Sequence, residues 1–276
     1  MNAAAHVLEP AKRPDFFYKF RSIRNVTERR RLMTIIKANQ IYYASPGSFN
    51  DPFDCKVPLV GSFDPGFVRY LIAAQSAKNY EDHFEVYHKF IAPGTTTQAE
   101  RDALRSDLDS EEQTEFRNLI DRIQQKVNET GVLSFSAICD SILMWSHYAD
   151  NHRGVCLKFS LERWRDMSMA LYPVGYSVER LSLQLDRQSY EQGQLIRAVT
   201  LTKDQCWQYE QEWRVLGKTP GEFPFPLDAL VGIIFGCMAS EADKARVRRA
   251  VARRTHVVLY QAKMKEGEFG LDILPC

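Results

Sequence analysis

The sequence contains no closely spaced pair of cysteines. Its six cysteines, at positions 55, 139, 156, 206, 237 and 276, never form the CxxC spacing of zinc and redox sites. An even count permits disulfides, but the opening residues, MNAAAHVLEPAKRPDFF, lack the apolar core of a secretory signal. We therefore expect a cytoplasmic protein whose thiols are reduced.

Long apolar runs and an excess of one charge sign are missing as well. No stretch approaches the roughly 18 apolar residues of a membrane-spanning helix, so we expect no membrane partner. The 36 basic and 35 acidic side chains leave a formal net charge of +1. This balance excludes the overall electrostatics of a nucleic-acid coat protein or a polybasic membrane binder.

Basic side chains nevertheless gather in two places. Arg29–Arg31 stand at the start of a predicted helix, where the helix dipole disfavours positive charge. Several further arginines crowd a helix predicted at 240–253. These clusters are compatible with a nucleic-acid target or substrate, although solvated helix faces have the same composition. A protein target and a regulatory partner are open as well. The sequence leaves the oligomeric state open.

Hydrophobic periodicity predicts short strands interspersed with helices, without a regular βαβ period. This pattern is typical of an α+β fold with a mixed or antiparallel sheet. We expect residues 1–15 to form a flexible lead and residues 16–276 a single domain with a helical insertion at about 64–130. Strands are predicted at 16–20, 41–44, 131–135, 155–159, 172–178, 195–201, 207–216, 231–235 and 256–262, and further helices at 27–39, 139–148 and 240–253.

The first polar motif is SPGSFNDPFD at 45–54. Asn50-Asp51-Pro52 is a strong turn signal, because Asn and Asp bond back to the local backbone and proline fixes φ. Carboxylates on a stiff loop could also bind a metal, a sugar hydroxyl or a phosphate-bearing ligand. A structural turn and a ligand-binding loop are both consistent with this motif.

The second polar motif is MWSHYADNHRG at 144–154. It holds two histidines, and His147 and His152 do not have the i, i+4 spacing of a helical zinc pair. Burying so many polar groups is costly unless they find partners. The motif is therefore either a surface loop or the wall of a site.

The third polar motif is WQYEQEWRV at 207–215. If it forms one strand, Glu210, Glu212 and Arg214 share one face, and the two carboxylates are about 7 Å apart at the backbone. Such a pair can address one ligand. Alternatively, Arg214 neutralises two carboxylates on a solvated strand face. We expect the three motifs to converge, with Asn50, Asp51, His147 and Glu212 lining one cleft.

The three motifs also carry a family resemblance. Together with FYKFRS, IYYA and GIIFGCMAS, and in the same order over most of residues 16–250, they identify the chain as a member of the bacterial domain of unknown function 2971 family. The family name implies no activity.

The layout further resembles ADP-ribosyltransferase-like folds, in which NAD lies across a split mixed sheet. The resemblance implies a basic residue on the first core strand, aromatic or serine positions on the second, and a catalytic ExE pair on a later strand. Carried onto this chain, the candidate catalytic residues are Glu212, Glu210 and His147. The candidate NAD-binding residues are Lys19, Arg21, Tyr42, Tyr43, Ser45, Asn50, Asp51, Tyr148 and Arg153.

The implied activity is cleavage of the nicotinamide–ribose bond of NAD and transfer of ADP-ribose to a macromolecular target, in a bacterial toxin or anti-phage setting. Bond cleavage passes through an oxocarbenium-like state, which a carboxylate such as Glu212 can stabilise. Glu210 would then position the incoming nucleophile. The chain lacks the STS triplet that follows the second strand in such enzymes.

Two other classes of function remain open at this point. In a metal-dependent nuclease or phosphoesterase, Asp51, Asp54, Glu210 and Glu212 would hold Mg²⁺, with His147 as the base. In a non-catalytic ligand sensor or interaction module, the same clusters would only bind.

Overall fold

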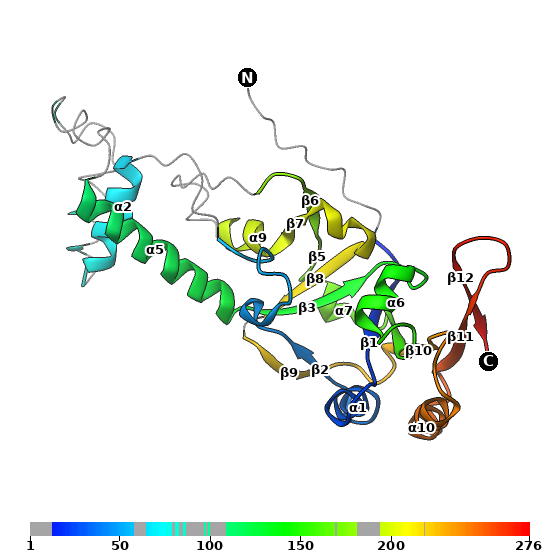
Figure 1. Ribbon diagram of the computed structural model, residues 1–276. Helices are drawn as coiled ribbons and strands as arrows, with labels where there is room; N and C mark the ends of the chain where they lie inside the picture. Colours follow the sequence, from blue (N-terminus) through cyan, green and yellow to red (C-terminus); the bar gives the residue numbers. More distant parts are fainter. Residues whose placement is uncertain are drawn as a thin grey trace. The chain divides into compact units, whose positions relative to one another are not determined.

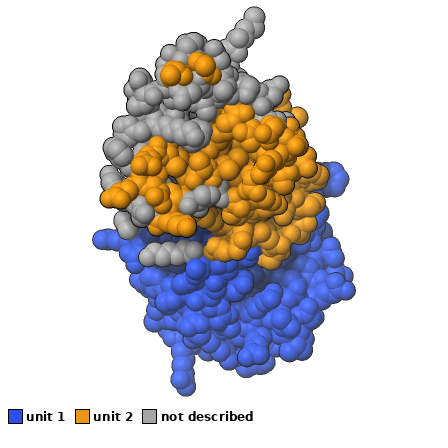
Figure 2. All heavy atoms as spheres, turned by 90° about the vertical axis from the view of Figure 1, so that its left-hand side faces the viewer, with its two compact units in different colours: residues 1–45, 130–176, 205–276 blue, residues 46–129, 177–204 orange. Residues whose placement is uncertain are grey.

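A computed structural model describes residues 13–57, 65–78, 81–82, 85–86, 97, 99, 109–168, 170–180, 194–217 and 219–276. The chain divides into two compact units, which Figure 2 distinguishes by colour. Unit 1 comprises residues 1–45, 130–176 and 205–276, and unit 2 comprises residues 46–129 and 177–204. Most of the predicted lead at 1–15 lies outside the described residues.

Unit 1 is built on an eight-stranded sheet in the order β12-β11-β10-β4-β1-β3-β8-β5. The pair β10–β11 is parallel and the other neighbours are antiparallel, so the prediction of an α+β fold with a mixed sheet is confirmed. The strands are β1 (Phe16–Arg21), β3 (Gly131–Ser136), β4 (Val155–Ser160), β5 (Leu171–Pro173), β8 (Glu212–Gly217), β10 (Leu230–Phe235), β11 (Val258–Met264) and β12 (Leu271–Pro275).

Both faces of this sheet are covered, because side chains on its central strands alternate between two apolar clusters. On β1, Phe17 faces one cluster and Phe20 faces the other. The cluster of Phe17 is completed by helices α1 (Val26–Met33) and α10 (Glu241–Val251), and that of Phe20 by helix α6 (Ile142–Tyr148). Figure 1 shows these helices around the sheet.

A small second sheet pairs β2 (Gln40–Tyr43) with β9 (Gly221–Pro224). It is tied to the large sheet by two backbone hydrogen bonds of 2.8 Å between Ala44 and Val132. This link fixes the position of Tyr43, whose ring meets that of Phe223 at 5.2 Å.

The helices begin and end where their capping residues predict. Asn25 accepts a hydrogen bond from the Glu28 backbone at the start of α1, which continues through a π-helical turn, η1 (Thr34–Ala38), to a left-handed Asn39. The helix predicted at 27–39 is therefore confirmed. So is the one predicted at 240–253, which forms α10.

Two arginines of the basic cluster on α10 form ion pairs within the helix. Arg246 lies 2.6 Å from Asp243, and Arg248 lies 3.6 Å from Glu241. The Asp243–Arg246 contact has the i, i+3 spacing of neighbours on a helix surface, and Glu241 and Arg248 are seven residues apart, about two turns along the same face. Both contacts favour the interpretation of this cluster as a solvated helix face.

Unit 2 is helical around its own apolar cluster. Its elements are η2 (Pro46–Ser48), α2 (Pro65–Ser76), α5 (Ser110–Glu129), α9 (Gln194–Leu201) and the short strand β7 (Thr202–Asp204). Helices α2 and α5 agree with the helices predicted between 64 and 130. Arg69 of α2 forms a bidentate ion pair with Glu112 of α5, at 2.6 and 2.8 Å.

The strand predicted at 195–201 is wrong, because these residues form α9. Ile196 and Val199 pack on the apolar cluster of unit 2 with the three-residue spacing of a helix face. A short apolar run reads equally well as a strand or a buried helix, so periodicity alone could not decide. The strand predicted at 172–178 divides into β5 and β6 (Gly175–Ser177).

No helix within the described part of the chain is long and apolar enough to cross a membrane.

All six cysteines are free thiols that differ in exposure. Cys206 and Cys276 are exposed, whereas burial raises the pKa of the Cys156 thiol well above its usual range. Because the thiolate is the reactive form, Ellman's reagent should modify Cys206 and Cys276 first in the native protein. After denaturation without reductant, the same titration should count all six thiols, and a smaller count would contradict the expectation of reduced cysteines.

Candidate carboxylate and aromatic site

The second and third polar motifs meet in unit 1, where helix α6 contacts the 3-10 helix η3 (Gln205–Glu210). Their principal contact joins the Tyr148 hydroxyl, which donates a hydrogen bond, to Oε1 of Glu210 at 2.6 Å. We call Tyr148, Tyr176, Glu210, Glu212 and Arg214 the carboxylate cluster. It contains both predicted catalytic glutamates and one predicted NAD-binding residue.

Helix α6 places Tyr148 through caps and packing near its ends. Ser141 accepts a hydrogen bond from the Met144 backbone at the N-terminus, and the Trp145 indole donates to the Cys139 carbonyl at 2.8 Å. Met144 and Trp145 are buried against the sheet. Because the buried side of α6 is fixed in this way, the Tyr148 hydroxyl is held at Glu210, the last residue of η3.

The strand predicted at 207–216 is wrong over its first half. Residues 205–210 form η3, Gln211 adopts a left-handed φ of 42°, and strand β8 begins only at Glu212. Trp207 and Tyr209 pack with His147 of α6 and do not share the face of Trp213. The predicted strand spacing between Glu210 and Glu212 therefore does not apply.

Glu210 is buried and held from two sides. Its carboxylate accepts from Tyr148, and its backbone carbonyl accepts from Oγ of Ser136 at 2.7 Å. Burial, followed by the Glu210 charge, raises the pKa of Tyr148 far above its usual value. The tyrosine is thereby kept protonated, as a donor to the carboxylate.

Glu212 is fixed more firmly, by an ion pair within its own strand. Nε and Nη2 of Arg214 lie 2.8 and 2.9 Å from Oε1 and Oε2 of Glu212, so both carboxylate oxygens accept from the guanidinium. The backbone N–H of Glu212 donates to the Tyr176 hydroxyl at 2.7 Å. Neutralisation by Arg214 is thus confirmed for Glu212. The accompanying expectation of a solvated face is wrong, because Glu212 is only 6% exposed and Arg214 is fully buried.

An aromatic surface lies next to Glu210. His147 is exposed and Trp207 and Tyr209 are half-buried, with ring centroids 6.0 to 6.4 Å apart. We call these three residues the aromatic platform. The His147 ring is also 6.4 Å from that of Tyr148, so the platform continues directly to the partner of Glu210.

Lys19 and Arg21 of β1 do not join the cluster. Alternation places Lys19 on the face of Phe17 and Trp213, opposite to Glu212. Its ammonium donates to the Ser134 carbonyl at 2.8 Å. Its pKa is well below the usual range, first because of burial and then because of Arg21, and the Glu212 charge opposes this lowering.

Burial and the charge of Arg31 lower the pKa of Arg21 to about 10. Within the described part of the chain, the buried Nε of Arg21 has no hydrogen-bond partner. Arg21 and Lys19 share the strand face opposite to that of Glu212.

The remaining candidates of unit 1 are dispersed. On β2, Tyr42 is exposed and Tyr43 is half-buried against Phe223, and Ser45 follows the end of that strand. Arg153 is exposed on the loop after α6. These four residues lie on β2, directly after it and on the loop after α6, whereas the carboxylate cluster is built from α6, β6, η3 and β8.

The loop after α6 explains much of the second polar motif. Asp150, Asn151 and His152 all have left-handed φ values, of 50°, 51° and 65°. Asn and Asp tolerate this region best, and each such residue costs roughly 1–3 kcal/mol unless its surroundings hold it. The His152 ring stacks on Trp145 at 6.3 Å and contacts Ser146, so this histidine supports the loop.

Asn50 and Asp51 belong to unit 2, so the shared cleft with His147 and Glu212 stays a prediction. Asp51 accepts a hydrogen bond from the Phe53 backbone at 2.9 Å, which confirms the turn. Asp54 is buried 3.7 Å from the ammonium of Lys203. Among the described residues, no group of three or more His, Cys, Asp or Glu side chains is arranged to hold a metal ion.

Tyr176 and Ser136 are the members of the site that sequence reasoning missed. Each lies far from the ExE motif in sequence and carries no local signal, since its role arises from sheet pairing and from the turn before β8. Only the register of β3 with β8 brings Ser136 beside Glu212.

These features define an α+β protein with a buried carboxylate cluster beside an aromatic platform. Residues 144–215 match the family described as Protein of unknown function (DUF2971), which confirms the family resemblance over that segment. The matched segment begins in α6 and ends in β8, and so contains all five residues of the carboxylate cluster. No curated protein and no solved structure matches the chain.

Proposed function

We propose that the protein cleaves the nicotinamide–ribose bond of NAD at the carboxylate cluster and transfers ADP-ribose to a macromolecular acceptor. The observation that carries the proposal is the Tyr148–Glu210 hydrogen bond beside the aromatic platform. It joins a fixed carboxylate to rings on which a nicotinamide or adenine could stack. The toxin or anti-phage setting stays a prediction from the resemblance.

The chemistry requires one bond to break and one to form. As the C1′–N bond breaks, its electron pair leaves with nicotinamide and the ribose develops oxocarbenium character. A carboxylate held close to the ribose stabilises this positive charge. The acceptor nucleophile then adds to C1′, and its proton passes to solvent.

The geometry favours Glu210 over Glu212 as the stabilising carboxylate. Both oxygens of Glu212 are bonded to Arg214, whereas Glu210 is bonded to the tyrosine that adjoins the platform. In this proposal Tyr148 orients Glu210, and the Glu212–Arg214 pair supports the start of β8 from within. The resemblance alone instead implies that Glu212 stabilises the charge and that Glu210 positions the nucleophile.

A platform variant tests substrate binding. Trp207→Ala is expected to weaken NAD binding by about tenfold, because stacking a base on an aromatic side chain contributes roughly 1–3 kcal/mol. Isothermal titration calorimetry of the full chain with NAD measures this change. The matched control is Phe269→Ala, which removes a fully exposed aromatic ring elsewhere in unit 1 and should leave NAD affinity unchanged.

The direct test of the function is release of nicotinamide from NAD by the purified chain, followed chromatographically. No release in the presence of candidate protein and nucleic-acid acceptors, together with no calorimetric NAD binding, would overturn the proposal and leave a non-catalytic module. Equal NAD affinity of the wild type and Trp207→Ala would remove the platform from the site.

The nuclease alternative has less support. Its proposed Mg²⁺ ligands include Glu212, whose two oxygens are both bonded to Arg214, and Asp54, which faces Lys203. The described part of the chain also contains no cluster of three or more metal-binding side chains. We therefore favour NAD cleavage over metal-dependent hydrolysis as the proposed function.

A further inference from the structure

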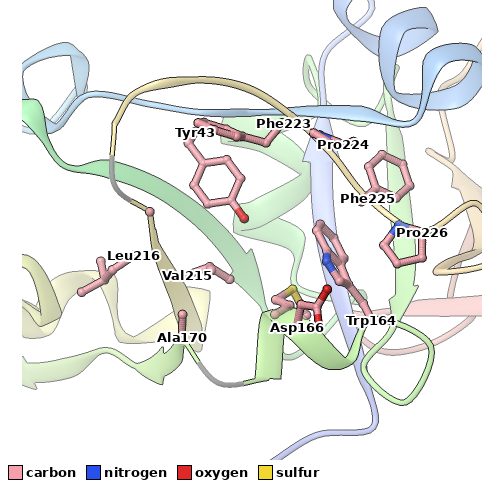
Figure 3. Close-up of a pocket in the computed structure, with 12 residues that line it drawn as sticks. Tyr43, Trp164, Asp166, Ala170, Val215, Leu216, Phe223, Pro224, Phe225 and Pro226 are labelled. Carbon is pink, nitrogen blue, oxygen red and sulfur yellow. The ribbon is translucent and has the colours of Figure 1, made fainter.

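A concave site in unit 1 is lined mainly by apolar side chains, four of which are aromatic. It encloses about 510 Å³ between the β2–β9 sheet, the end of β8 and the short helix α7 (Arg165–Ser168). We call it the aromatic pocket and define it by Tyr43, Trp164, Asp166, Phe223 and Phe225. Figure 3 shows these side chains around one space.

The aromatic pocket is separate from the carboxylate cluster. Val215 lines the pocket and packs in the same apolar cluster as Trp213. Glu212 and Arg214 alternate with these two residues along β8 and therefore point from its other face. A ligand in this pocket would contact neither Glu210 nor the aromatic platform.

The polar groups of the pocket are few. Asp166 is exposed, and its carboxylate has no hydrogen bond or ion pair to any other described residue. The Tyr43 hydroxyl points into the space in Figure 3 and likewise lacks a partner among the described residues. Burial raises the pKa of Tyr43, so its hydroxyl stays protonated. The lining contains one carboxylate and no lysine or arginine.

We propose that this pocket binds a small, flat organic cation of the pyridinium class. Aromatic rings attract cations through their quadrupoles, and an unpaired carboxylate adds a favourable charge. The same carboxylate repels anions, which disfavours phosphates and carboxylates inside the pocket. The volume lies within the range of small-molecule sites and accommodates one substituted ring. The inference is independent of NAD cleavage at Glu210.

Three ring compounds of nearly equal shape and different charge test the proposal. Calorimetric titration of the full chain is carried out with 1-methylnicotinamide (cationic), nicotinamide (neutral) and nicotinate (anionic). The cation should bind about tenfold more tightly than the neutral ring, as expected from roughly 1.4 kcal/mol of charge-dependent attraction. Nicotinate should show no binding.

Two pocket variants separate charge from stacking. Asp166→Asn should lower the affinity for 1-methylnicotinamide about five- to tenfold and leave nicotinamide unchanged. Phe223→Ala removes a ring that is 37% exposed, and it should weaken both compounds while the fold persists. The matched control is Glu162→Gln, which removes an exposed negative charge on the segment before α7, outside the pocket lining.

Three results would overturn the inference: no binding of 1-methylnicotinamide at millimolar concentration, equal affinity for the cation and the neutral ring, or an unchanged affinity in Asp166→Asn. The Trp207→Ala variant keeps the two proposals apart, because it should weaken NAD binding and leave 1-methylnicotinamide binding intact. A loss of 1-methylnicotinamide binding in Trp207→Ala would assign that compound to the platform and would also overturn the inference.

Discussion

Glu210→Gln is expected to lower the rate of nicotinamide release from NAD by about 100- to 1,000-fold, the usual loss when one preorganised stabilising group is removed. Glutamine keeps the size of the side chain and can still accept the hydrogen bond of Tyr148, but it cannot balance the positive charge of an oxocarbenium-like state. NAD affinity should change little, because the charge matters mainly in the transition state. Single-turnover kinetics with calorimetric Kd values separate the two effects.

Tyr148→Phe provides the accompanying test of orientation. It removes the donor to Glu210 while keeping the ring, so the rate should fall by a smaller factor, about tenfold. Glu266→Gln, at an exposed position before Gly267, controls for the loss of one negative charge. Full activity of Glu210→Gln with an unchanged melting temperature would exclude Glu210 as the catalytic carboxylate.

The central part of the fold could be predicted because its sequence patterns are strong. Strands β3, β4 and β10 are mostly apolar runs buried on both faces, and their predicted positions, like that of β1, agree with the structure within one or two residues. Helix α10 has a serine N-cap and an amphipathic repeat. In these elements local propensity and tertiary burial favour the same conformation.

The errors arise where a tertiary contact overrides the local pattern. WQYEQEWRV alternates as a strand should. However, Gln211 adopts a left-handed conformation and its carbonyl accepts a hydrogen bond from the Ala137 backbone, so the strand begins only at Glu212. Trp207 and Tyr209 then pack against α6. No residue in this motif is a glycine or asparagine, so the sequence carries no signal for the turn.

The candidate site could be predicted from the sequence only in part. The types and order of its residues were visible in the sequence, and α6 does meet the glutamates of the third motif. The difference between Glu210 and Glu212 was not visible, because it depends on which carboxylate faces the Arg214 guanidinium and which faces Tyr148. Such distinctions come from rotamers and from the β3–β8 register, neither of which leaves a pattern in one sequence.

The Glu212–Arg214 pair yields the second large expected effect. Arg214→Met is expected to destabilise the protein by about 3–5 kcal/mol, because removing one member of a buried ion pair leaves the other charge without its main partner. Methionine retains much of the volume, so the loss comes mainly from the charge and its hydrogen bonds. Urea unfolding followed by far-UV circular dichroism and by tryptophan fluorescence measures the free energy of unfolding.

The double variant Glu212→Gln/Arg214→Met distinguishes a support of the fold from a catalytic pair. When both charges are removed, neither member of the pair is left without the other, so the double variant should be less destabilised than the sum of the two single variants by about 1–3 kcal/mol. If Glu210 is the catalytic carboxylate, the double variant should also retain NAD cleavage at a temperature where it is folded. Additive destabilisation would show that the pair is not coupled. A folded double variant without activity would return the catalytic role to Glu212, because the loss of its charge would then act on the reaction and not on the fold.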